Sequence, residues 1–127
     1  MKTEYGILTK DKSKISYCSF VQAILIELGL SPTSKGTYYL RDIILLALQE
    51  NNFNDIRLID LRNKLAQIEH IPPNTIKANI DYTFRFKDTS KAKENFETIF
   101  HIQYDEYYIT AKSLTNLIIR LIYNKHF

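Results

Sequence analysis

The sequence predicts an all-α fold of at least five helices built around a central helix-turn-helix. Two observations support this prediction. Every strongly periodic segment repeats its apolar residues at intervals of three and four, which is the period of an amphipathic α-helix. Two of these segments, residues 56–69 and 73–86, are joined by a turn with two adjacent prolines, which prevent one long helix.

Length and composition predict one helical domain behind a short arm. The chain has 127 residues, of which 45% are hydrophobic, enough for one domain with a buried core. Residues 1–16 are polar and mixed in charge, and we assign them to an N-terminal arm; residues 17–127 form the domain. The net charge of +3 permits nucleic-acid binding but does not require it.

Three features predict a cytoplasmic protein. Cys18 is the only cysteine, so no internal disulfide can form, which suits a reducing compartment. No apolar run approaches the ~20 residues that a membrane span needs. The first residues carry acids and lack the apolar core of a signal peptide. We therefore expect no membrane partner.

The sequence of the first part of the domain predicts two helices. Apolar residues at helical spacing predict a helix over 17–30, followed by a polar loop at 31–36. The next helix is expected over 37–50, with Arg41 and Asp42 on its polar face.

The two motif helices follow. Asp55 is a favourable N-cap for the helix over 56–69. Ala66 places a small side chain where the two helices must approach, and Ile71 fills the turn at 70–74. Any packed helical hairpin can show the same pattern without a role in DNA binding, so that alternative stays open.

The last third of the chain is less regular. Residues 87–96 are polar, and the pattern over 97–110 fits a helix, a strand or a short hairpin. A final helix is predicted over 112–124, where apolar residues return to helical spacing.

Helical geometry defines an outward face on the second motif helix, opposite Ile76 and Ile80. Its residues are Asn74, Thr75, Lys77, Ala78, Asp81, Tyr82 and Arg85. Asparagine can pair with adenine, lysine with guanine or phosphate, and alanine with the thymine methyl group. Asp81 would be repelled by phosphates unless it accepts a hydrogen bond from a cytosine amino group.

Three features follow one another early in the domain. They are a helix that ends in a glycine, a loop that contains Lys-Gly, and a helix that carries Tyr-Leu-Arg followed by an acidic residue. These features lie in VQAILIELGL (21–30) and KGTYYLRDII (35–44), and the pattern continues through Leu61, Leu65-Ala66 and Ile76 to SLTNLIIRLI (113–122). With them, the chain from Tyr17 to about Lys125 resembles the DNA-binding effector domain of the stage-zero sporulation master regulator family of Firmicutes. The match is weak over 88–110.

The resemblance implies about six helices, promoter recognition through the second motif helix, and side-by-side binding to paired half-sites as a homodimer or tandem copies. The family carries a phosphorylatable receiver domain, which the residues before Tyr17 are too few to form, so no aspartyl-phosphate switch is expected. The family's face is rich in arginine, unlike the outward face here, so a different target sequence is expected. Pro72-Pro73 is a further departure, at the start of the second motif helix.

No enzyme, cofactor or metal site is predicted. The three histidines lack the spacing of metal ligands, and three glycines leave no phosphate-cradling loop. No small-molecule ligand is evident either.

Two functions stay open. The preferred one is a stand-alone, sequence-specific DNA-binding transcription regulator, which Asn74, Lys77 and Arg85 favour. The alternative is a degenerate relative that kept the fold but binds a protein, as an antagonist, without binding DNA. Ala78 and Asp81 favour this alternative.

Overall fold

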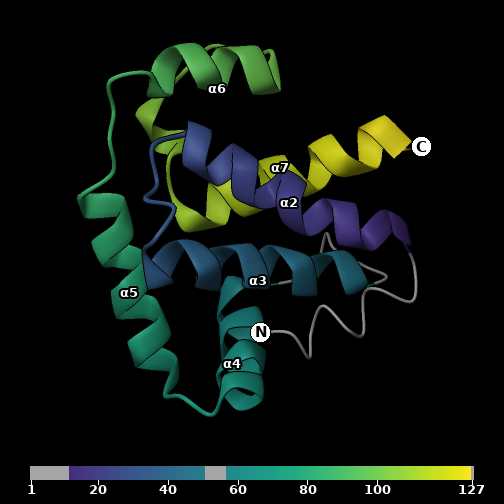
Figure 1. The fold of residues 1–127 in the computed structure, drawn as a ribbon, viewed down its shortest axis with the longest axis vertical. Coiled ribbons are helices and arrows are strands. Elements are labelled where there is room, and N and C mark those ends of the chain that lie inside the picture. Colours follow the sequence, from purple (N-terminus) through teal and green to yellow (C-terminus); the bar gives the residue numbers. More distant parts are fainter. Residues whose placement is uncertain (1–11, 51–56, 127) are drawn as a thin grey trace.

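Six α-helices and one short 3₁₀ helix make up the residues that the computed structural model describes, 12–50 and 57–126 (Figure 1). They are α2 (Lys12–Glu27), α3 (Lys35–Gln49), α4 (Leu58–Glu69), α5 (Pro73–Arg85), α6 (Ala92–Phe100), the 3₁₀ helix η2 (Glu106–Tyr108) and α7 (Ala111–His126). These residues contain no strand, so the all-α prediction and the expected number of about six helices are confirmed.

Helix α3 is the centre of the fold. It lies across the middle of the molecule in Figure 1 and packs against α2, α4, α5 and α7. Every residue from Arg41 to Ala47 is buried. A helix that is buried on all sides belongs inside the core rather than on its surface, and the other helices cover it.

The prediction that Arg41 and Asp42 lie on an outer polar face is wrong. They are only 7% and 2% exposed, because α2 packs on this side of α3. Arg41 Nε donates a hydrogen bond to Asp42 Oδ1 at 3.2 Å, its guanidinium also bonds to Gln22 of α2, and it lies 5.0 Å from the ring centre of Tyr38. These partners make the burial of two charges tolerable.

Three helix starts differ from the prediction by two residues or more, and one of them is α3, which begins at Lys35 rather than at residue 37. Helix α2 begins at Lys12, earlier than the expected residue 17. Helix α4 begins at Leu58, two residues later than expected, with Arg57 at the N-cap position; Asp55, the predicted N-cap, lies outside the described residues.

Helix α6 forms in a segment that the sequence left open. Its anchor is Phe96, which is fully buried. The ring centres of Phe100, Tyr104 and Tyr108 lie 4.9, 5.6 and 5.8 Å from the ring centre of Phe96. Two of these rings belong to α6, and the other two belong to the loop and the 3₁₀ helix that follow. The spacing of apolar residues over 97–110 therefore matched neither a helix nor a strand.

Helices α3 and α5 approach each other closely at Gly36. A Cβ atom at this position would overlap the backbone oxygen of Asn79 and the hydroxyl of Thr83. The hydroxyl of Ser34, at the N-cap position of α3, shares a hydrogen bond with the Thr83 hydroxyl instead of capping its own helix. Together these contacts seat α5 against the N-terminal end of α3 (Figure 1).

We predict that Gly36→Ala destabilises the protein. Alanine favours a helix by about 1 kcal/mol over glycine, but the added methyl group must displace α5, and overpacking of this kind costs about 1–3 kcal/mol. Urea unfolding followed by circular dichroism would measure the difference. Lys35→Ala, at the exposed neighbouring position, is the control and should change stability little. Equal stability of Gly36→Ala and wild type would contradict the close approach.

Candidate nucleic-acid interface

Helices α4 and α5 are joined by a short turn at residues 70–72. His70 adopts the left-handed conformation, with φ 58° and ψ 43°, and its backbone N–H donates to the carbonyl of Ala66. Glycine most often occupies such a helix end, so His70 takes the place of the glycine that the sequence lacks here. Pro73 occupies the first turn of α5, where its missing N–H leaves no hydrogen bond unmade.

Helix α5 buries one narrow stripe, with Asn79 and Phe84 half-buried at its edges. Ile76, Ile80 and Thr83 are buried, and α3 is the main neighbour of this helix. All residues of the predicted outward face are exposed: Asn74, Thr75, Lys77, Ala78, Asp81, Tyr82 and Arg85. The structure therefore brings them together on one accessible helix surface.

An ion pair lies within the outward face. Lys77 Nζ donates to Asp81 Oδ2 at 2.8 Å, and their side chains are 56% and 54% exposed. Exposed pairs at this spacing contribute only about 0.3–0.5 kcal/mol, so a ligand can break the pair easily. While it is formed, these two charges cancel, and Arg85 is the remaining charged residue of the outward face.

Two large aromatic side chains sit beside each other at the C-terminal end of α5. Tyr82 and Phe86 are 59% and 64% exposed, and their ring centres are 4.6 Å apart. Tyrosine and phenylalanine are enriched at interaction surfaces relative to the rest of a protein surface, so this pair is a candidate contact. Tyr82 was predicted from the sequence as part of the outward face, whereas Phe86, which immediately follows the end of α5, was not.

An open hollow of about 330 Å³ separates this aromatic pair from the loop before α3. Its lining residues are Ser31, Thr33, Ser34, Lys35, Asn79, Tyr82, Thr83 and Phe86. Four of these are serines or threonines, Lys35 carries the one charge among them, and no acidic residue lines the hollow. The sequence analysis assigned 31–36 to a loop and could not place it near α5, since Ser34 and Thr83 are 49 residues apart.

The loop after α5 is fastened to the turn after α2. The N–H of Asp88 donates to the carbonyl of Gly29 at 2.8 Å. Gly29 has φ 103°, and a Cβ there would overlap the backbone of Asp88. The carboxylate of Asp88 accepts a hydrogen bond from the N–H of Ser90, which lowers the pKa of Asp88. This attachment fixes the path of the chain just beyond Phe86.

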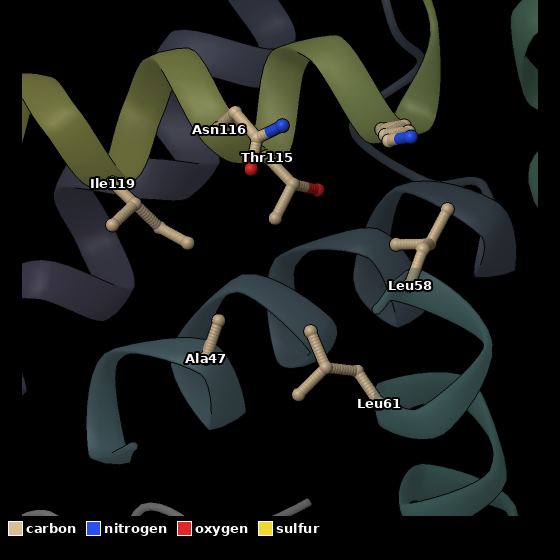
Figure 2. Close-up of a pocket in the computed structure, with 7 residues that line it drawn as sticks. Ala47, Leu58, Leu61, Thr115, Asn116 and Ile119 are labelled. Atoms are coloured by element: carbon tan, nitrogen blue, oxygen red, sulfur yellow. The ribbon is translucent and has the colours of Figure 1, made fainter. Parts of the chain in front are cut away.

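A separate small cavity lies between α3, α4 and α7 (Figure 2). Ala47, Leu58 and Leu61 form one wall, and Thr115, Asn116, Ile119 and Lys112 of α7 form the other. Its volume of about 20 Å³ holds about one water molecule. A cavity this small is not a ligand site.

Comparisons with protein-family models, with curated proteins and with solved structures found no match to this chain. Among the helices described, none is both long and apolar enough to cross a membrane. The described residues also contain no group of His, Cys, Asp and Glu side chains arranged to hold a metal ion.

We predict that the two sides of α5 respond oppositely to truncation. Ile76 is fully buried, so Ile76→Ala should lower the free energy of unfolding by about 2–5 kcal/mol. Lys77→Ala removes an exposed side chain from a weak ion pair and should change it by less than about 0.5 kcal/mol. Urea titration of both variants would test this. A large loss in Lys77→Ala would show that the outward face has a structural role.

Proposed function

We propose that this chain is a sequence-specific DNA-binding transcription regulator that inserts the outward face of α5 into the major groove of duplex DNA. The observation that carries the proposal is the division of α5 into two faces. Its buried residues pack against the rest of the protein, whereas every residue of the predicted outward face is exposed to solvent. A helix presented in this way after a short turn fits the dimensions of the major groove.

The chemistry of the outward face supports base recognition. Asn74 offers the donor and acceptor pair that matches adenine, and Arg85 offers the fork that matches guanine. Ala78 lies between them with a methyl group suited to thymine. Base contacts of this kind specify a sequence, whereas contacts to phosphate position the protein.

The proposal accords with the sequence resemblance to the sporulation regulator effector domain. By analogy with that family, α4 and α5 form the helix-turn-helix, and the protein binds paired half-sites as a homodimer or as tandem copies. Such a regulator acts in the cytoplasm, where the bacterial chromosome lies. Its target sequence differs from the family's, because the arginines of the family's face are replaced here.

A second candidate function is a protein-binding antagonist that does not bind DNA. The ion pair between Lys77 and Asp81 favours it, because the pair leaves the middle of the outward face without net charge. The exposed rings of Tyr82 and Phe86 also suit a protein partner. Affinity for duplex DNA separates the two candidates.

We predict that selection from a random duplex pool enriches one motif, and that binding to it weakens as salt rises. The logarithm of the affinity should fall with the logarithm of salt concentration by about 0.9 for each phosphate contact. Arg85→Ala should weaken binding to the selected duplex by about 1–3 kcal/mol if Arg85 pairs with a base. Fluorescence anisotropy with labelled duplexes would measure both effects.

Two controls make the result decisive. A duplex with the selected motif scrambled should bind more weakly than the selected one, and Arg85→Ala should lose more affinity for the selected duplex than for the scrambled one. If no duplex binds even at low salt, the proposal is wrong and the protein-binding candidate replaces it.

A further inference from the structure

The outward face of α5 cannot supply much of the attraction that a regulator needs. Phosphate contacts from lysine and arginine provide most of the non-specific affinity for DNA. Lys77 is paired with Asp81, and the other charged residue of the face is Arg85. Further cations that contact phosphate are therefore needed close to α5.

Such cations lie around the exposed aromatic pair. Lys35 lines the same hollow as Tyr82 and Phe86, on the opposite side from α5. Lys87 directly follows Phe86, and its ammonium donates to the carbonyl of Phe84 at 3.3 Å. We call this surface the basic flank, comprising Lys35, Tyr82, Phe86 and Lys87.

The hollow that contains Lys35 leaves the charge of this lysine without an acidic neighbour among its lining residues, whereas Lys87 is followed directly by Asp88. A second hollow, of about 430 Å³, lies on the other side of Phe86, and there Lys91 is accompanied by Glu27 and Asp88. That second hollow is thus not basic, and the attraction for an anion is concentrated between α5 and the loop before α3.

We propose that the basic flank binds the phosphodiester backbone of duplex DNA beside the groove that α5 enters. The proposal rests on the proposed function and adds the surface that supplies its affinity. The flank shares Tyr82 with the outward face, so one duplex can contact both. Lys35 and Lys87 attract phosphates, the exposed hydroxyls of Ser31 and Thr33 bond to phosphate oxygens, and the two rings pack against the sugars.

The attachment of the following loop supports this assignment. The hydrogen bond from Asp88 to Gly29 and the close approach of their backbones fix the chain directly after Lys87. A phosphate-binding surface gains affinity when its groups are already in place before the ligand arrives. The main chain that follows Lys87 is therefore held in place before a ligand arrives.

The test compares single variants on a selected duplex and on an unrelated one across a salt series. Lys35→Gln and Lys87→Gln should each reduce the salt slope by about 0.9 and weaken binding roughly eightfold near 0.1 M salt, equally on both duplexes. Lys87→Arg, which keeps the charge, should restore the slope. Phe86→Ala should weaken both complexes without changing the slope. Arg120→Gln, an exposed charge on α7, is the matched control and should bind like wild type.

The outcomes separate this inference from the proposed function. If the wild type binds its selected duplex but the lysine variants keep its slope and affinity, the basic flank does not contact DNA and the proposed function stands. Binding of wild type and of the lysine variants to poly-L-glutamate, an acidic polypeptide, is measured in parallel. If the variants lose binding to poly-L-glutamate but not to DNA, the flank is a surface for an acidic protein and the inference is overturned. If the wild type binds no duplex at low salt, both proposals fail.

Discussion

The contact between Gly36 and α5 is the constraint on which the surface described here depends. Because Gly36 has no side chain, α5 seats directly against the N-terminal end of α3. The hydrogen bond between Ser34 and Thr83 holds the same end of α3 to α5. This seating turns one face of α5 inward and the other outward. It also places the loop before α3 next to the C-terminal half of α5, which creates the hollow between them.

The accessible residues of α5 could be predicted from the sequence because a single helix determines them. Knowing that Ile76 and Ile80 are buried is enough to place the opposite face in solvent. The basic flank could not be predicted in this way. Lys35 and Phe86 belong to segments far apart in the chain, and no period within either segment shows that they meet. Arg41 and Asp42 were misplaced for a related reason, since only the packing of α2 explains their burial.

Histidines that take the conformation usually reserved for glycine also limited what the sequence could predict about helix ends. The turn between α4 and α5 lacks the glycine that usually ends a helix, yet His70 adopts the same left-handed conformation. His101 does so at the end of α6. Histidine adopts the left-handed conformation more often than most residues other than glycine. A histidine in a sequence nevertheless does not indicate that this conformation is present. The end of α4 at residue 69 was predicted from the prolines that follow it, but the left-handed conformation of His70 and the end of α6 were visible only in the structure.

The complete burial of the middle of α3 has a consequence for any attempt to shorten the protein. Every side of Arg41–Ala47 is covered by a different neighbour, and these neighbours come from both halves of the chain. A fragment holding only the α4–α5 hairpin would expose Ile76 and Ile80 and lose the partner that orients them. A fragment without α7 would leave part of α3 bare. The smallest unit that presents α5 correctly is therefore nearly the whole helical domain, and a short peptide copied from α5 would lack its defined orientation.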